Sequence, residues 1–572
     1  MKKNILVFFG FCALTAAMTY PLIFKINNHM PGFFSTDEPS LWYYWWLRYS
    51  HAHGITSVFS NFIAFPFGID LSVVEKINPL WSGITKSLAL IGNECFIYNI
   101  QALSGFILAG FFIYLMVKRL TASRVAAFFS GIIFAFCPYH FVRSWQHLGL
   151  AYTQWLPLFL FSLFLLKDKI NKKNIIFAFL SFYLVFSFDL YYAYFSLLIV
   201  SVFVIYLLLK ERKGSSRPVF WITVVSLANI LVLAFRLMPI IAAAKVNISP
   251  SEWGIVRPFD YLFSQSARPL SYFLPASVHP IFGRFTEQFV GTSLYGGSFT
   301  EHVLYLGWTP LALAFIAFKK RRGNFYIGFF LLLTVAAWIF SQPPWWSIFG
   351  FKIYMPSFFM YKIIPMFRAY CRFGIVLMLA VAVLAGFGLK FILGKFKSQK
   401  TKIAVTVLFS ALVLFEFWNY PPFKVIDLSR VPQVYYWLKE QPGDFVIAEY
   451  PLDAKNPNEK YKFAQTVHEK RIINGTIPGT YAHDVAQTII KLSDLNTAKA
   501  LYQMKVKYIL VHREGYFKTD LVEDREELER IPLNSDLKLI KRFPAEECLP
   551  KGAMCMQKTG PIDVYELRIK SQ

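Results

Sequence analysis

Two adjacent carboxylic acids, Asp37 and Glu38, stand directly before a run of aromatic residues, WYYWW at 42–46. A carboxylate that tryptophan rings partly shield from water has a raised pKa, and such a carboxylate suits general-base catalysis. We therefore predict that Asp37 or Glu38 acts as a base. The same residues would also start a helix, with Thr36 or Asp37 as its N-cap and Glu38 in its first turn. The aromatic run is typical of a membrane interface, and stacking against a sugar is the alternative for these rings.

Arginines form the second group of candidates. Arg143 lies in YHFVRSWQHLGL, and Arg368 and Arg372 lie one helical turn apart in PMFRAYCRF. Each guanidinium group presents a planar set of donors that matches a phosphate, and two such cations at a membrane surface suit an anionic lipid. We predict that these arginines bind phosphate. Snorkelling of the long basic side chains towards water accounts for them equally well.

Further polar residues are candidates for the same site. His147 lies one helical turn beyond Arg143 and would orient or protonate a leaving group. Asp189, in SFDLYY, stands at the predicted outer end of an apolar segment and could line the same cavity as Asp37. A bond from a tyrosine hydroxyl to Asp189 and an ordinary loop around His147 are the structural alternatives. Glu301, in TEHVLYLGW, is interpreted as the start of a helix.

The elements that must position these residues are membrane helices. Of 572 residues, 56% are hydrophobic and 16% are charged, whereas roughly a quarter of the residues of a soluble protein are charged. Apolar runs such as ILVFFGFCALTAAMTYPLIF approach the roughly 20 residues that span a bilayer, and a backbone in lipid must form helices. We predict about eleven crossings, near 5–24, 96–117, 125–142, 148–166, 175–189, 191–209, 219–243, 302–318, 325–340, 373–393 and 403–419.

The basic residues indicate orientation rather than a nucleic-acid partner. The net charge is +25, and the basic residues cluster between the apolar runs, as in KDKINKKN (167–174) and KKRRGN (319–324). The positive-inside rule places these clusters and the N-terminus in the cytoplasm. An odd number of crossings then places the C-terminal part outside the cytoplasm, together with the stretches 25–95, 244–301 and 341–372.

The composition changes near residue 421. Strand-like segments such as FVIAEYPL and VKYILVH alternate there with helical ones such as DLVEDREELERI. This alternation predicts a soluble α/β domain at 421–572, after a transmembrane domain at 1–420 whose first outer loop spans 25–95. Cys548 and Cys555 would form a disulfide in an oxidising compartment. The chain lacks a metal-binding CxxC spacing, and we predict neither a metal nor a cofactor.

These features resemble the GT-C superfamily of membrane glycosyltransferases. The pair DE at Asp37 and Glu38 is similar to the acidic pair in the first loop of the protein O-mannosyltransferase and aminoarabinose transferase branch. FIAFPFGIDL, TQWLPLFLF, EHVLYLGWTPLALA and FRAYCRFGIV look like a bacterial group described as GT-C-like. The resemblance implies a polytopic helical membrane protein of GT-C-like fold in the bacterial inner membrane. The oligosaccharyltransferase branch uses a metal with further acidic motifs, which this sequence lacks.

The resemblance also implies a reaction. The donor would be a polyprenyl-phosphate-linked sugar in the bilayer, and the acceptor a glycan, a lipid or a protein. Asp37 or Glu38 would deprotonate the acceptor hydroxyl, and transfer would invert the sugar carbon in one displacement. Arg143, Arg368 or Arg372 would meet the phosphate. A transporter or flippase of lipid-linked saccharide, and a non-catalytic envelope-assembly protein, are the alternatives, although the paired repeats of many transporters are absent.

Overall fold

The structure is a computed structural model that describes residues 2–32, 38–211, 214–247, 256–418, 423–452, 457–477, 480–517, 522–549 and 553–568. The chain divides into two compact units. The first unit comprises 1–23, 100–239 and 254–424, and the second comprises 24–99, 240–253 and 425–572. The large first loop of the sequence therefore clusters with the C-terminal part.

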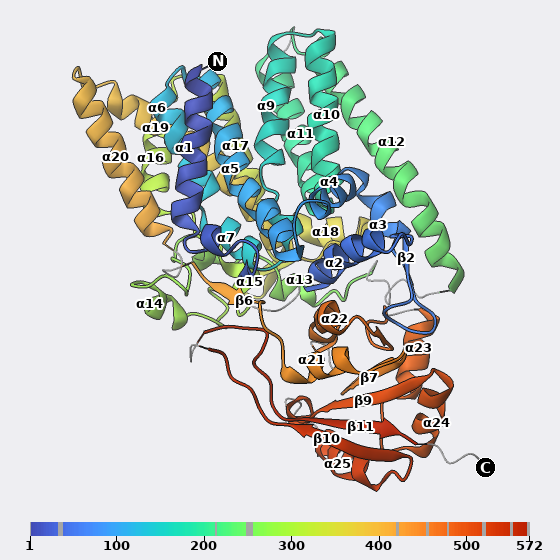
Figure 1. The fold of residues 1–572 in the computed structure, drawn as a ribbon. Helices are drawn as coiled ribbons and strands as arrows, with labels where there is room; N and C mark the ends of the chain where they lie inside the picture. The colour runs from blue at the N-terminus through green and yellow to red at the C-terminus, as the bar shows by residue number, and fades with distance from the viewer. Residues whose placement is uncertain are drawn as a thin grey trace. The chain divides into compact units, whose positions relative to one another are not determined.

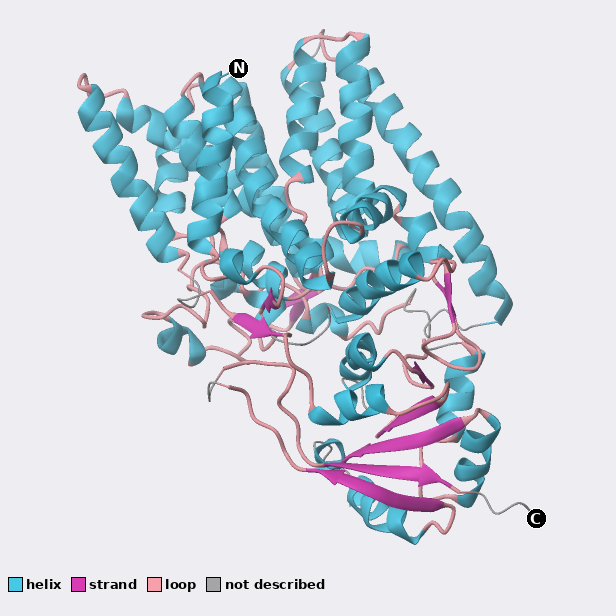
Figure 2. Cartoon of the chain, in the orientation of Figure 1, coloured by secondary structure: helices cyan, strands magenta, loops and turns pink. Residues whose placement is uncertain are grey.

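The first unit is built almost entirely of helices (Figures 1 and 2). Its main helices are α1 (Lys2–Met18), α5 (Glu94–Thr121), α6 (Arg124–Ala135), α7 (Pro138–Trp145), α8 (Leu148–Ala151), α9 (Trp155–Asp168), α10 (Lys172–Phe188), α11 (Leu190–Lys210), α12 (Ser216–Asn247), α16 (Trp308–Lys319), α17 (Phe325–Phe340), α19 (Gly374–Leu393) and α20 (Gln399–Glu416). Short elements join them: α13 (Tyr261–Ser264), η2 (Pro269–Tyr272), α14 (Gly283–Glu287), α15 (Phe299–His302), β4 (Trp345–Ile348), β5 (Phe351–Tyr354), α18 (Pro356–Ile363) and η3 (Tyr370–Phe373).

Helix α19 forms the core of the first unit. Its residues 374–389 are all buried, and it packs against α16, α17 and α6. Glycine permits the closest of these approaches, because a Cβ atom on Gly388 would lie 2.0 Å from the backbone oxygen of Leu313. Small residues allow neighbouring membrane helices to approach in the same way, since lipid offers no hydrophobic driving force between helices.

Each predicted crossing overlaps a helix, but the count of eleven is not confirmed. Among the described residues, four helices are long and apolar enough to span a membrane, at Glu94–Thr121, Leu190–Lys210, Ser216–Met238 and Tyr370–Leu393. The pair α6 and α7, bent by 42°, would make a fifth. The remaining overlapping helices are shorter or less apolar, as with α9, which has 14 residues.

The second unit contains a five-stranded sheet of order β10-β11-β9-β7-β8. Strand β7 (Val446–Tyr450) runs parallel to β8 (Arg471–Ile472) and β9 (Val506–His512), whereas β11 (Ile562–Leu567) is antiparallel to β9 and β10 (Leu537–Phe543). All of β7 is buried, as expected for a central strand covered on both faces. Helices accompany it: α21 (Gln433–Glu440), α22 (Pro457–His468), α23 (Tyr481–Thr488), α24 (Leu495–Gln503), α25 (Val522–Arg530) and the short η4 (Arg513–Phe517) and η5 (Ile531–Leu533).

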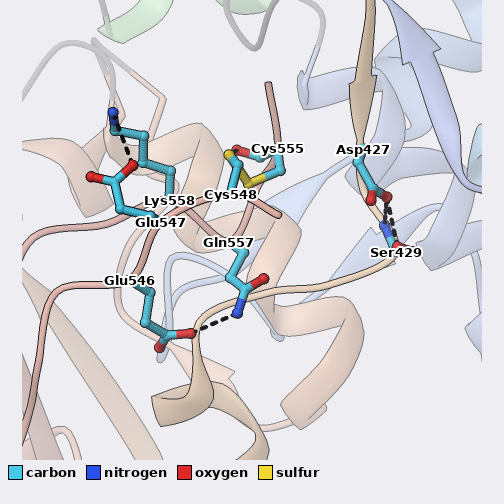
Figure 3. The surroundings of a disulfide bond; sticks show 8 residues. All are labelled: Asp427, Ser429, Glu546, Glu547, Cys548, Cys555, Gln557 and Lys558. Atoms are coloured by element: carbon cyan, nitrogen blue, oxygen red, sulfur yellow. Dashed lines mark hydrogen bonds and ion pairs between the residues drawn. A yellow bond between two sulfur atoms is a disulfide. The ribbon is translucent and has the colours of Figure 1, made fainter. Parts of the chain in front are cut away.

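The α/β character predicted for the C-terminal part is confirmed, and the structure adds further elements. The predicted strands FVIAEYPL and VKYILVH correspond to β7 and β9, and the predicted helix DLVEDREELERI corresponds to α25. The prediction missed β6 (Val425–Asp427), α22, β8, η4, η5 and β10. Figure 3 shows that Cys548 and Cys555, between β10 and β11, are joined by a disulfide.

The first-loop residues of the second unit form η1 (Leu22–Lys25, which begins in the first unit), β1 (His29–Pro31), α2 (Glu38–Ala52), β2 (Phe59–Ser60), β3 (Ile69–Asp70), α3 (Ser72–Ile77) and α4 (Pro79–Ala89). Strand β1 pairs with β6 (Val425–Asp427). Helix α2 packs against α22 and α4, so that Trp42, Tyr44 and Trp46 are all less than 3% exposed. The aromatic run predicted to lie at a membrane interface is therefore buried inside the protein, because α2 has two helices to pack against.

Candidate functional site

A buried ionic cluster joins three segments of the first unit. Arg143 of α7 donates to both carboxylate oxygens of Glu301 of α15, at 3.3 Å and 2.6 Å. Arg372 of η3 donates to the same carboxylate, with its shortest contact, Nη2 to Oε1, at 2.5 Å. The Cys371 thiol also points at Glu301, with 3.2 Å between Sγ and Oε2. The structure thus brings together two of the predicted phosphate ligands.

Glu301 is the centre of this cluster and not merely the start of a helix. Burial alone would raise the pKa of its carboxyl group, but the Arg143 and Arg372 guanidinium groups hold that pKa well below its ordinary value. The carboxylate is therefore ionised and neutralises one of two cations, and the cluster keeps one positive charge. Glu301 belongs to no acidic motif in the sequence. A lone carboxylate in an apolar segment is nevertheless costly, and this feature could have identified Glu301 as a functional candidate.

His147 lies between α7 and α8, where its backbone has a left-handed φ of 68°. Burial, followed by the positive charges of Arg143 and Arg372, lowers the pKa of His147 to about 4. The ring is therefore uncharged at neutral pH, and its Nδ1 atom has no hydrogen-bond partner among the described residues. A neutral imidazole can orient a ligand, and it is less suited to protonating a leaving group.

Asp189 is the N-cap of α11. Its side chain accepts a hydrogen bond from the Tyr192 backbone N–H at 3.0 Å, which satisfies one of the free donors at the start of that helix. A Cβ atom on Gly149, in α8, would lie 3.6 Å from the other carboxylate oxygen. Asp189 therefore lies beside the α8 segment that follows His147. The sequence offered a tyrosine hydroxyl as the partner of Asp189, whereas the structure shows the backbone N–H of Tyr192 in that role.

Arg368 and Arg257 form a second cationic pair. Arg368 is half-buried, with its guanidinium carbon 4.9 Å from the centre of the Tyr261 ring. The Arg257 backbone N–H donates to the Pro365 carbonyl at 3.1 Å, which brings Arg257 to the segment of Arg368. Burial, followed by the charge of Arg257, lowers the pKa of Arg368. Over the part of the chain that the structure describes, no carboxylate lies within ion-pairing distance of either arginine. The sequence offered no specific signal for Arg257, which stands before a proline in the 244–301 stretch.

Tyr191 connects the two groups of arginines. The guanidinium carbon of Arg372 lies 4.4 Å from the centre of the Tyr191 ring. The Tyr191 hydroxyl accepts a hydrogen bond from the Arg368 backbone N–H at 3.4 Å. The ionic cluster is thus adjacent to the unpaired cations, and together they form a positively charged region that could hold an anion.

The first-loop acids belong to the second unit. Asp37 lies outside the described residues, and Glu38 is the first residue of α2, with a side chain that the structure does not describe. The catalytic role of both acids remains a prediction. Among the described residues, no group of three or more histidine, cysteine or acidic side chains could hold a metal ion.

Comparison with known proteins shows similarity in structure only. No family model matches the chain, and no curated protein matches its sequence. The mycobacterial arabinofuranosyltransferase AftD matches 98% of this chain with a TM-score of 0.55 and 13% identity. The match covers 40% of AftD. The oligosaccharyltransferase of Archaeoglobus fulgidus, tethered to an acceptor peptide, matches with a TM-score of 0.52 and 12% identity. The match covers 95% of this chain and 72% of the oligosaccharyltransferase.

A third match is ArnT from Cupriavidus metallidurans bound to undecaprenyl phosphate, which covers 97% of both chains at 11% identity. Its TM-score of 0.47 is too low to support an inference. All three proteins are GT-C glycosyltransferases. The likeness to AftD and to the oligosaccharyltransferase shows that this chain shares their fold, as the GT-C resemblance of the sequence implied. The chain spans less than half the length of AftD, so the activity of that protein does not transfer with the fold.

Proposed function

We propose that the chain is a membrane glycosyltransferase that moves a sugar from a polyprenyl-phosphate donor to a glycan, lipid or protein acceptor. The GT-C fold supports this class of reaction. The observation that carries the proposal is the pair Arg257 and Arg368, two cations without an acidic partner among the described residues, next to a cluster that is itself positive. A lipid phosphate is an anion that such a pair would bind at a membrane surface.

The two groups of arginines would have different roles. Arg257 and Arg368 would contact the phosphate directly, because their charges are not already neutralised. Arg143 and Arg372 are bound to Glu301, and they would act through the remaining positive charge of the cluster and through Tyr191. His147 and Asp189 would line the same region, His147 as a neutral orienting group.

In the proposed reaction Asp37 or Glu38 removes the proton from the acceptor hydroxyl. The acceptor oxygen attacks the sugar carbon while the bond from that carbon to the phosphate oxygen breaks, which inverts the configuration. The charge that develops on the departing polyprenyl phosphate would be stabilised by Arg257 and Arg368. Preorganised cations are effective here because they need not reorient as charge develops.

The proposed orientation places the N-terminus in the cytoplasm of a bacterial cell and the second unit outside its inner membrane. The distribution of basic loops supports this orientation. The disulfide between Cys548 and Cys555 also supports it, since disulfides persist outside the reducing cytosol.

A binding and transfer experiment tests the proposal. The full-length protein in lipid nanodiscs would be titrated with undecaprenyl phosphate, with binding followed by native mass spectrometry. We expect Arg257→Gln and Arg368→Gln each to weaken binding about tenfold or more, because each removes a charge-assisted contact. Arg321→Gln, in the predicted cytoplasmic loop before α17, is the matched control and should leave binding unchanged. Equal binding of undecaprenyl phosphate by the unmodified protein and all three variants would contradict the proposed phosphate site.

Transfer is measured separately with radiolabelled polyprenyl-phosphate sugars and membrane extracts as acceptor. Asp37→Asn or Glu38→Gln should abolish transfer while undecaprenyl phosphate binding persists. If neither substitution lowers transfer, the first-loop acids are not the base. If the protein only moves labelled lipid between leaflets without forming product, the flippase alternative replaces the proposal.

A further inference from the structure

A two-stranded β-hairpin between α17 and α18 exposes several apolar side chains. Strands β4 and β5 pair in the register Trp345↔Tyr354 to Ile348↔Phe351, and Phe349 and Gly350 form the turn. Phe349 is 97% exposed and Phe351 is 77% exposed. Exposed apolar side chains continue through the hairpin and α18, at Ile348, Ile353, Tyr354, Phe359 and Ile363. A two-stranded hairpin of this kind is only marginally stable in water.

The turn sequence is unfavourable for an aqueous hairpin. Phe349 has φ 49° and Gly350 has φ 83°, so both turn residues are left-handed, as in the two-residue turns that prefer asparagine followed by glycine. A phenylalanine in the left-handed region is conformationally strained. The sequence thus keeps a large apolar side chain at the most exposed position despite a conformational cost.

The base of the hairpin is held in place while the tip is free. The Trp345 ring packs edge-on against Phe263, with 4.7 Å between ring centres, and Tyr354 packs against Phe358 of α18 at 4.7 Å. The backbone N–H of Met355 closes the base by donating to the Pro344 carbonyl at 2.9 Å. The tip is therefore presented on a rigid support.

Two lysines flank this apolar surface. The Lys352 ammonium lies 4.6 Å from the Trp345 ring centre, and the Lys362 ammonium lies 4.4 Å from that of Phe358. Neither has a carboxylate partner among the described side chains. Exposed rings beside unpaired cations are typical of segments that lie at a membrane interface with anionic lipids.

We propose that the tip of this hairpin, Ile348 to Phe351, inserts into the near leaflet of the bilayer, with Lys352 and Lys362 at the level of anionic headgroups. Insertion is limited to the tip, because both strands have free edges whose backbone groups cannot be satisfied in hydrocarbon. The segment proposed to bind phosphate is close to this anchor, since the Arg257 backbone N–H donates to the Pro365 carbonyl just after α18. The inference does not require transferase activity.

Spin labelling of the full-length protein tests the inference. A nitroxide is attached at Phe351→Cys in nanodiscs of phosphatidylcholine and phosphatidylglycerol, in a background with Cys12→Ser. We expect collisions with oxygen to exceed those with a water-soluble nickel chelate several-fold relative to a label at Ser293→Cys, an exposed position of the same unit. Equal ratios at the two positions would overturn the proposal. A label at position 351 that is shielded from both reagents would also overturn it, since a protein partner would then cover the hairpin.

Two further variants separate insertion from folding. Phe349→Asn fits the left-handed turn, so the hairpin should remain intact while the oxygen preference of the label at position 351 falls. Lys352→Gln with Lys362→Gln should remove any difference in that preference between nanodiscs with and without phosphatidylglycerol. An unchanged preference in Phe349→Asn would show that the tip does not reach lipid. A lipid-composition difference that survives loss of both lysines would show that they do not meet the headgroups.

Discussion

Replacing Glu301 with glutamine tests whether the ionic cluster is held together by one buried carboxylate. Glutamine keeps the shape of the side chain but removes its charge. Two buried guanidinium groups would then face each other without a counter-ion. Five arginine contacts to the carboxylate, at 2.5–3.3 Å, would be weakened or lost.

The expected cost follows from the burial of the three residues. Arg143 is fully buried, and Glu301 and Arg372 are 4% and 8% exposed, so water cannot replace the lost carboxylate. Breaking a buried ion pair by removing one partner typically costs about 3–5 kcal/mol, because the remaining charge stays buried. We expect Glu301→Gln to lower the free energy of unfolding by about that amount. The assay is denaturant unfolding in detergent, followed by circular dichroism.

A double-mutant cycle isolates the interaction from other effects. Arg372→Gln alone should cost less than Glu301→Gln, because Glu301 keeps its contact with Arg143. The double substitution should cost clearly less than the sum of the two. Glu287→Gln, an exposed acid of α14, is the control and should change stability by less than about 0.5 kcal/mol. The reasoning is refuted if Glu301→Gln costs less than about 1 kcal/mol, which is the value of a surface pair.

Two more predictions concern other parts of the molecule. Gln465→Leu should destabilise the second unit by about 1–3 kcal/mol in the same unfolding assay, since it leaves the buried Trp42 indole N–H without its acceptor. Gln441→Leu is the control and should cost less, because it breaks one hydrogen bond at a half-buried site. His147→Gln should flatten the dependence of stability on pH, measured as the unfolding midpoint across the acid range. The folded state holds the pKa of His147 at about 4, below its ordinary 6.5. As the pH falls from 6.5 to about 4, the unfolded state takes up a proton on His147 before the folded state does. The contribution of the neutral His147 ring to stability is therefore complete above pH 6.5 and is lost as the pH falls to about 4.

The sequence predicted individual helices and the class of fold, but it did not predict which charges neutralise each other. Local hydropathy located every long helix, because lipid requires a continuous apolar run. Arg143 and Arg372 were predicted to bind phosphate, and the structure shows both buried and paired with a carboxylate. Their counter-ion, Glu301, is 158 and 71 positions away along the chain. Local spacing carries no information about such a pairing, so both arginines were expected to be available to a ligand.

The first loop shows the same limit on a larger scale. Backbone hydrogen bonds join residues 62–65 to β8, as from the Ile472 N–H to the Phe62 carbonyl at 2.9 Å and from the Phe65 N–H to the Ile472 carbonyl at 3.1 Å. Strand β8 is a two-residue edge strand, and an uncovered edge is prone to pair with other chains. The first loop therefore covers the open edge of a sheet about 400 positions later in the chain.

Gln465 extends this connection to α2. Its amide N–H groups donate to the Phe62 carbonyl at 2.5 Å and to the Lys470 carbonyl at 2.8 Å, while its carbonyl accepts from the Trp42 indole at 2.7 Å. Trp42 is one helical turn beyond Glu38, where α2 begins. The sheet and α22 thus fix α2, the helix that begins at Glu38. A loss of transfer after damage to α22 would accordingly reflect misplacement of α2, even though α22 carries no predicted catalytic residue.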